Sequence, residues 1–187
     1  MGWGTTTHPA GTKTLDAFAA ELGTDVDILD AAVVDGAIYA AVRHPEHTNG
    51  KVACEVSLYD RTSRNGHLSI AFKHMGETMG PNATSAPGRI MALLDPVDDL
   101  YPSDSERRTA SAWRDRVAAT HARKAAVAAA LPAVGATATI RNDLDLTSDI
   151  AGESGTVTTR TRTHVTLRIH GDLYRMPHAY LALDLKD

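Results

Sequence analysis

The stretch that decides the fold reads GHLSIAFKHMGETMGP over residues 66–81. Its first part alternates Leu68, Ile70 and Phe72 with small or polar residues, which predicts a β-strand with one buried face. The strand leads into a loop with glycine, methionine and ionisable side chains, and a short apolar segment follows the loop. Residues 66–96 therefore predict a strand, a connecting loop and a covering helix.

Three β-rich runs precede this strand and belong to the same sheet. Turn residues separate the runs, as at Asn65-Gly66, a pair that is typical of hairpins. Period-two alternation predicts an antiparallel four-stranded sheet with one buried face and one solvated face. A helix over residues 15–22 has an apolar stripe of its own and is expected to cover the buried face. The four runs span residues 26–34, 37–42, 52–59 and 67–72.

A long helix is predicted to follow the sheet. Ser103 and Glu106 form a capping box, in which each side chain satisfies a free backbone N–H of the first turn. We expect the helix to continue to about residue 130, where a proline follows. Its buried stripe is predicted to contain Trp113 and Val117.

The C-terminal third of the chain consists mainly of short β-rich runs, unlike the helical segment before it. Five short β-runs between residues 136 and 185, spaced by turns, predict a small β-barrel of the SH3-like kind. The predicted fold class is therefore α+β, with an antiparallel four-stranded sheet and covering helices. The predicted divisions are an α+β domain over residues 1–100, a long connecting helix over 101–132 and an SH3-like barrel over 133–187.

The net charge, the single cysteine and the lack of long apolar runs disfavour several classes of protein. A formal net charge of −4 disfavours a uniformly basic nucleic-acid coat but leaves local charged patches open. The single cysteine, Cys54, excludes an intrachain disulfide and a multi-cysteine zinc site, and its register with Val52 and Val56 predicts a buried thiol. No apolar run reaches the roughly 18–20 residues that a membrane span needs. With no secretory leader pattern either, we expect a cytoplasmic protein without a membrane partner, in the host cytoplasm if a phage encodes it.

The loop offers one candidate site. Lys73, His74 and Glu77 lie within five residues, and such side chains serve as acids, bases or electrostatic partners. A loop held between a strand and a helix is also a common place for function. The alternative is a structural loop, in which the methionines contact the core and the glycines form a turn.

A second cluster is His44-Pro45-Glu46-His47. Zinc and nickel accept such ligands, but a site needs three or four converging groups. We expect a solvated hairpin tip, and we predict neither a metal nor a cofactor for this chain.

The C-terminal runs offer a partner surface. Between residues 157 and 170 the odd positions hold Val, Thr, Leu or Ile, whereas most even positions are basic. If the stretch keeps strand parity, the basic side chains project from one face. Arginine binds phosphate through paired hydrogen bonds, so this face predicts binding of nucleic acid or another partner, with a merely solvated face as the alternative. The predicted binding residues are Arg160, Arg162, His164, Arg168, His170 and Arg175.

A scattered set of residues over the first 120 positions is also recognisable. The set consists of Met1-Gly2-Trp3, Phe72-Lys73, Met75, Glu77, Met79, Gly80, Pro81, Pro87, Ile90, Leu93, Leu94, Pro96 and Ala112-Trp113-Arg114. It resembles a domain family of unknown function that occurs in phage, plasmid and other mobile-element proteins. The resemblance implies a mobile-element origin and no particular activity. Members have Cys-Pro where this chain has Ala86-Pro87, so no cysteine chemistry carries over.

Three hypotheses follow. We expect a non-enzymatic accessory protein of a phage or mobile element that binds nucleic acid or a nucleoprotein partner through the basic face. The alternative is a structural or assembly protein, such as a virion or conjugation component, whose partner is another protein. The third hypothesis is an enzyme centred on residues 73–80.

Overall fold

The computed structural model of the chain describes residues 4–7, 14–64, 67–78, 81–144, 146 and 149–183. The chain divides into two compact units, Met1–His121 and Ala122–Asp187, and the boundary falls within the long helix α4 (Asp104–Ala130). None of the helices in the described ranges is long and apolar enough to cross a membrane. The predicted Asn65-Gly66 turn and the Met79-Gly80 part of the loop lie outside the described residues.

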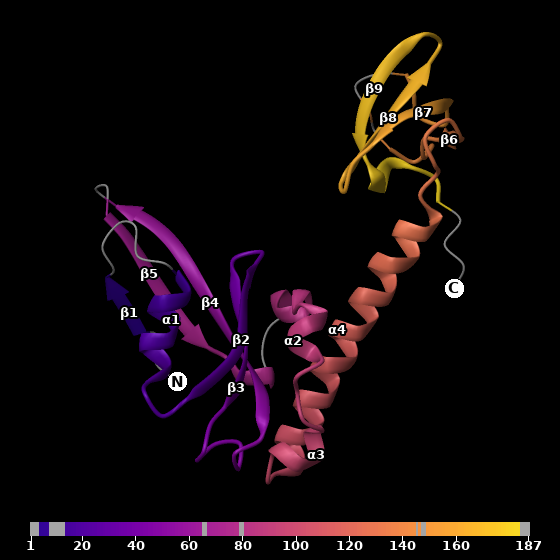
Figure 1. The fold of residues 1–187 in the computed structure, drawn as a ribbon. Coiled ribbons are helices and arrows are strands. Elements are labelled where there is room, and N and C mark those ends of the chain that lie inside the picture. Colours follow the sequence, from indigo (N-terminus) through magenta and orange to yellow (C-terminus); the bar gives the residue numbers. More distant parts are fainter. Residues whose placement is uncertain are drawn as a thin grey trace. The chain divides into compact units, whose positions relative to one another are not determined.

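The N-terminal unit is built on an antiparallel five-stranded sheet in the order β1-β5-β4-β3-β2 (Figure 1). The four predicted strands are confirmed, and β1 adds a fifth beside β5. Asp35 and Gly36 connect β2 to β3 with φ angles of 49° and 78°, as a two-residue hairpin turn requires. The strands are β1 (Gly4–Thr7), β2 (Asp27–Val34), β3 (Ala37–Arg43), β4 (Val52–Arg64) and β5 (His67–His74).

Both faces of this sheet are covered, so the prediction of one solvated face is wrong. On one face, Phe18 of α1 (Thr14–Leu22) packs with Ile38 and other side chains of the sheet. Helices α2 (Gly88–Met91) and α4 lie on the other face (Figure 1). There Trp113 of α4 and Ile90 of α2 pack with Tyr39. The reason lies in β3, whose residues from 37 to 42 are apolar on both sides and are all buried.

The long helix α4 begins at the predicted position, but only half of the predicted capping box is seen, because the Glu106 carboxylate accepts the Ser103 hydroxyl rather than a backbone N–H. The Glu106 N–H donates to Ser103 Oγ at 3.2 Å, while the Ser103 hydroxyl donates to Glu106 Oε2 at 2.6 Å. Ala110, Trp113 and Val117 are buried, which confirms the predicted stripe. The segment before α4 forms only short helices: η1 (Gly76–Thr78), η2 (Pro81–Ser85), α2 and α3 (Val97–Leu100).

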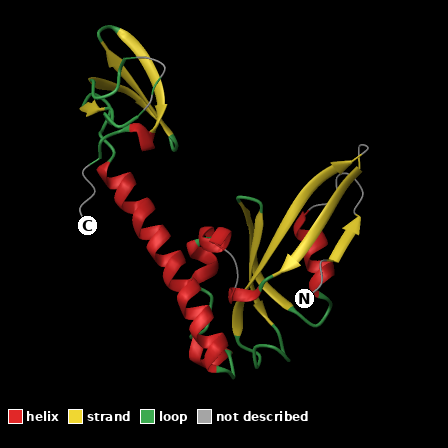
Figure 2. Ribbon diagram, turned by 180° about the vertical axis from the view of Figure 1, so that it is seen from behind, coloured by secondary structure: helices red, strands yellow, loops and turns green. Residues whose placement is uncertain are grey.

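The C-terminal unit contains an antiparallel four-stranded sheet in the order β6-β7-β8-β9 (Figure 2). Its core includes Val157, Leu167 and Met176. An isolated bridge pairs Ile140 with Leu181, which follows the short helix η3 (His178–Tyr180), and the sheet is open. The strands are β6 (Thr137–Thr139), β7 (Ser154–Arg160), β8 (His164–Ile169) and β9 (Asp172–Pro177).

Gly155 allows the backbone of β7 to lie close to Arg168 and Ile169 of β8. A Cβ atom at this position would lie 2.6 Å from Ile169 Cγ1 and 2.7 Å from the Arg168 carbonyl oxygen. Both distances are shorter than real contacts of a Cβ atom, and one of the two atoms is backbone. Glycine is therefore required where β7 passes the end of β8.

Candidate functional site

Among the residues that the structure describes, no strand pairs with the first half of β4 on its β5 side. β5 pairs with β4 only from Ser57 onward, where Ser57 lies opposite His74. Alternate backbone groups of β4 before this point face away from β3, among them those of Val52 and Cys54. Both residues are buried, so these groups need hydrogen-bond partners that water does not provide.

Two carboxylates complete this edge of β4. Glu77 of η1 accepts the Cys54 backbone N–H with Oε1 at 3.0 Å. Asp95 accepts the Val52 N–H with Oδ2 at 2.7 Å, and its own N–H donates to the Val52 carbonyl at 2.9 Å. The loop that follows β5 thus supplies the hydrogen bonds that a neighbouring strand would otherwise make.

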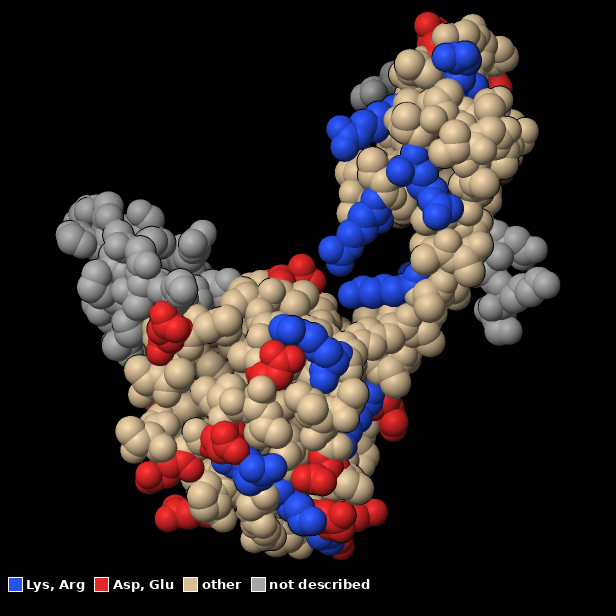
Figure 3. Space-filling view, in the orientation of Figure 1, with Lys and Arg blue, Asp and Glu red and all other residues tan. Residues whose placement is uncertain are grey.

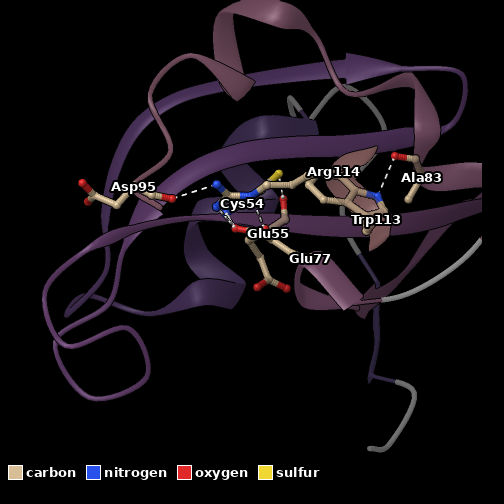
Figure 4. A network of polar contacts seen from close by, with 7 residues as sticks. All are labelled: Cys54, Glu55, Glu77, Ala83, Asp95, Trp113 and Arg114. Atoms are coloured by element: carbon tan, nitrogen blue, oxygen red, sulfur yellow. Dashed lines mark hydrogen bonds and ion pairs between the residues drawn. The ribbon is translucent and has the colours of Figure 1, made fainter. Parts of the chain in front are cut away.

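Arg114 of α4 joins the two acidic residues (Figure 4). Its Nε and Nη2 donate to the Glu77 carboxylate at 2.7 and 2.9 Å, and its Nη1 donates to the Asp95 carbonyl at 2.8 Å. The Glu77 side chain is fully buried, whereas that of Arg114 is 19% exposed. Burial alone lowers the pKa of Arg114, but the hydrogen bonds and charge of Glu77 outweigh this effect and raise it. Next to it, Trp113 Nε1 donates to the Ala83 carbonyl at 3.0 Å.

Burial and the charge of Glu77 change the pKa values of two neighbouring side chains, Cys54 and Tyr101. Burial raises the pKa of the Cys54 thiol well above its usual value, and the charge of Glu77 raises it further. Burial and then Glu77 likewise raise the pKa of Tyr101. A thiol that is held protonated and 1% exposed is a poor nucleophile, so the prediction of a buried structural cysteine is confirmed.

His74 lies on the α1 face of the sheet, whereas Glu77 faces α4. The Nδ1 atom of His74 is 3.4 Å from both Glu55 Oε1 and Ser57 Oγ, and its ring centroid is 5.8 Å from that of Phe18. The hydrogen bond with Glu55 raises the pKa of His74. Lys73 precedes it in β5, opposite Leu58. The three residues of the predicted loop site therefore do not converge on one cleft.

The C-terminal sheet brings three of the predicted basic residues together. Arg168 lies opposite Leu173, and Thr166 lies opposite Arg175. Because opposite residues share a face, Arg168 and Arg175 project from the same side, on a diagonal of about 7–8 Å between Cα atoms. His164 shares this side by strand alternation. We call this surface the arginine face, and it consists of Thr156, Thr159, His164, Thr166, Arg168, Leu173 and Arg175.

Arg160 does not belong to the arginine face, so the prediction of strict parity is wrong here. A β-bulge shifts the register between Val157 and Thr159. Arg160 consequently lies opposite the buried Val165, and its Nη1 donates to the Leu131 carbonyl at 3.1 Å. One inserted residue reverses the side to which all later side chains of the strand point.

The last two predicted residues lie in turns. Arg162 is exposed at the tip of the hairpin between β7 and β8. His170 lies in the turn between β8 and β9 with a φ of 51°, and its Nε2 is 3.4 Å from Glu153 Oε2. Both residues are close to the arginine face in sequence, but strand pairing does not place them on it.

Arginines with and without a carboxylate partner occur in both units: Arg108 and Arg116 of the N-terminal unit have no ion pair among the described residues, and Arg141 of the C-terminal unit pairs with Asp143. Arg43, Arg89, Arg107 and Arg114 of the N-terminal unit each pair with a carboxylate. By contrast, the side chains of Arg162, Arg168 and Arg175 make no ion pair or hydrogen bond within the described ranges. Figure 3 shows Lys and Arg mixed with Asp and Glu over the N-terminal unit, whereas the charged side chains on the mostly uncharged visible face of the C-terminal unit are more often Lys or Arg than Asp or Glu.

The hairpin tip at His44 is closed by its own hydrogen bonds. His44 Nδ1 accepts the backbone N–H groups of Glu46 and His47 at 3.2 and 3.3 Å. Within the part of the chain that the structure describes, no three His, Cys, Asp or Glu side chains gather as a metal site would require. The side chains of the hairpin tip therefore do not form a metal site together with other described residues.

The C-terminal unit also has a groove of about 470 Å³. Arg123 and Val127 of α4, together with Arg141, His178 and Leu181, contribute to its lining. Arg141 is already bound to the carboxylate of Asp143 through Nε at 2.9 Å. Buried His178 Nε2 has no hydrogen-bond partner among described residues. The groove thus has less unpaired positive charge than the arginine face.

No family model, no curated protein and no solved structure matches this chain. Its function is therefore inferred from its own geometry and chemistry.

The pairing of Arg114 with Glu77 was not predicted from the sequence. A signal was present, because Ala110, Trp113 and Val117 mark positions i, i+3 and i+7 of a buried stripe and Arg114 occupies position i+4. A charged side chain on a buried stripe needs a counter-charge. Glu77 lies 37 residues away in the chain, so no local pattern connects the two.

Substitution of Arg114 tests the structural role of this network. Arg114→Met leaves the buried Glu77 carboxylate without its cation, and we expect the N-terminal unit to lose about 3–5 kcal/mol of unfolding free energy. Arg43→Met is the matched control, because it breaks an exposed pair with Asp27 and should cost less than about 1 kcal/mol. Urea denaturation followed by circular dichroism measures both. Equal losses would contradict a buried, stabilising pair.

A second test concerns pH. The folded-state pKa of His74 is raised, mainly by Glu55 and further by the charge of Glu21 on α1. Protonated His74 therefore contributes to the unfolding free energy. This contribution is fully present below a value of about 6.5, the pKa of His74 in the unfolded chain, and is lost as pH rises through its pKa in the folded protein. We expect the unfolding free energy of the wild type to fall, relative to His74→Gln, as pH rises above this value. His47→Gln, at the exposed hairpin tip, should keep the wild-type slope; identical pH dependence in all three proteins would disprove the assignment.

Proposed function

We propose that this chain is a non-enzymatic accessory protein of a phage or another mobile element, and that it binds nucleic acid or a nucleoprotein through the arginine face. The observation that carries the proposal is the pair Arg168 and Arg175, which project from one side of the sheet without a carboxylate partner among described residues. An exposed guanidinium without a counter-ion is available for paired hydrogen bonds to phosphate. The neighbouring threonine hydroxyls are also suitable phosphate ligands.

The overall negative charge does not oppose this proposal. Residues 154–177, which include β7 to β9, contain four arginines and only one aspartate. Electrostatic attraction of a polyanion depends on such local excess, since charges farther away than about 10 Å are largely screened at 0.1 M salt. The mobile-element part of the proposal depends on the resemblance of residues 1–120 alone.

The C-terminal unit supports the same class of function if it is an SH3-like barrel. The segment after η3 pairs with the end of β6, because the Arg141 N–H donates to the Tyr180 carbonyl at 2.8 Å and the Ala182 N–H donates to the Thr139 carbonyl at 2.9 Å. These bonds join the segment that follows β9 to the end of β6, whereas β9 itself is not paired with β6; closure of a small barrel would need a continuous ladder there. The OB-fold, a partly open small barrel, binds oligonucleotides on a face of its strands, which is the kind of surface proposed for this unit.

The two alternatives have weaker support. An assembly protein would need an open surface for a protein partner, and the edge strand β2 is the first place to look. Yet β2 has a register shift after Ile28, and Arg89 pairs with Asp30 and donates to the Ala31 carbonyl at 3.0 Å. Bulges and charged side chains at an edge disfavour the addition of another strand. An enzyme centred on residues 73–80 would need Glu77, which Arg114 already occupies.

The double variant Arg168→Gln/Arg175→Gln tests the proposal. Loss of two phosphate contacts should weaken binding of DNA or RNA by about tenfold or more at 0.1 M salt, measured by electrophoretic mobility shift. Arg43→Gln/Arg89→Gln is the matched control, because it changes the net charge equally at two arginines that already have aspartate partners. Its affinity should stay within about twofold of the wild type, since exposed ion pairs contribute little.

Two results would refute the proposal. One is that the wild type binds neither DNA nor RNA at micromolar protein and low salt. The other is that both double variants lose affinity equally, because the interaction would then follow net charge rather than the arginine face. Circular dichroism of each variant confirms that it is folded.

A further inference from the structure

We propose that the arginine face binds duplex rather than single-stranded nucleic acid, and that it contacts the phosphate backbone without regard to base sequence. This inference rests on the proposed function and specifies its ligand. It follows from what the face contains and from what it lacks.

The arginine face has no aromatic platform for unpaired bases. Proteins that bind single strands gain about 1–3 kcal/mol per base from stacking on aromatic side chains. Tyr174 and Tyr180 are the tyrosines of the C-terminal unit, and both pack against its core. Tyr174 lies opposite the buried Leu167, on the side of the sheet away from Arg168. The one ring on the arginine face belongs to His164, whose Nδ1 is 2.8 Å from Thr163 Oγ1.

The face also lacks the means to read bases. Sequence is read by side chains that reach base edges in a groove, and the major groove admits a helix or a two-stranded ribbon. Arg168 and Arg175 project instead from a four-stranded sheet, which is too broad to enter a groove. The other side chains of the face are mainly threonines, and Thr159 Oγ1 donates to Thr166 Oγ1 at 2.9 Å. Guanidinium and hydroxyl groups on a broad surface suit phosphates, which position a protein but do not specify sequence.

Electrostatics then favours the duplex. A duplex has one negative charge per about 1.7 Å of its axis, and each neutralised phosphate contributes about −0.9 to the slope of log K against log salt, compared with about −0.7 for a single strand. If Arg162 joins Arg168 and Arg175, three contacts predict slopes of about −2.7 and −2.1. If duplex and strand bind equally at 1 M salt, this difference of about 0.6 in slope corresponds to about fourfold tighter binding of the duplex at 0.1 M.

Fluorescence anisotropy with the full chain tests this inference. The probes are a labelled 20-base-pair DNA duplex, one of its strands chosen to have no self-structure, and a duplex of shuffled sequence. Between 50 and 200 mM NaCl we expect the duplex to bind about fourfold tighter than the strand at 0.1 M, with a slope near −2.7. The shuffled duplex should bind within about twofold of the first. Arg175→Gln should reduce the magnitude of the slope by about 0.9, whereas Arg43→Gln should leave it unchanged.

The outcomes separate the inference from the proposed function. A strand that binds as tightly as the duplex, or tighter, overturns the duplex preference but leaves nucleic-acid binding intact. A shuffled duplex that binds several-fold more weakly overturns sequence independence. If neither probe binds, both the inference and the proposed function fail for DNA, and the same pair of probes made of RNA decides whether they fail altogether.

Discussion

The fold of the N-terminal unit depends on hydrogen bonds to the buried edge of β4 that β5 leaves unpaired. β5 leaves β4 at Ser57, yet the strand continues inward to Val52 beneath α2 and α4. Buried backbone groups without partners would cost about 1–3 kcal/mol each. The carboxylates of Glu77 and Asp95 accept these N–H groups, and Arg114 neutralises Glu77 from the helix. The same contacts therefore close the sheet and fix the helix on it.

This arrangement is the reason why we propose a binding surface in the other unit rather than a site at Glu77. Glu77 looked like a candidate catalytic group in the sequence, but its carboxylate is buried and already has a cation and a backbone donor. His74 faces α1 with Glu55. The arginines of the C-terminal sheet are the opposite case, since they are exposed and have no carboxylate partners among described residues. Because these guanidinium groups form no ion pairs with described residues, they can form ion pairs with a binding partner.

Local patterns in the sequence predicted most of the elements but not their long-range contacts. The four strands of the first sheet, the start of α4 and its stripe at Trp113 follow from alternation, helical period and capping. The second covered face was not predicted: the helix over residues 15–22 was expected as the cover, but α2 and α4 also pack on the opposite face, through contacts such as that of Trp113 with Tyr39 between residues far apart in the chain. The bulge after Val157 has no sequence signal that alternation can detect, and it moves Arg160 off the predicted face.

Amide hydrogen exchange of β4, resolved by NMR, tests the central claim most directly. The Val52 and Cys54 amides bond to the side chains of Asp95 and Glu77, whereas the Glu55 amide faces β3 in the sheet. We expect all three amides to exchange slowly, with protection within about tenfold of one another, because opening any of these hydrogen bonds requires the unit to unfold. Fast exchange of Val52 and Cys54 beside a protected Glu55 would contradict it, since the edge of β4 would then be open to water.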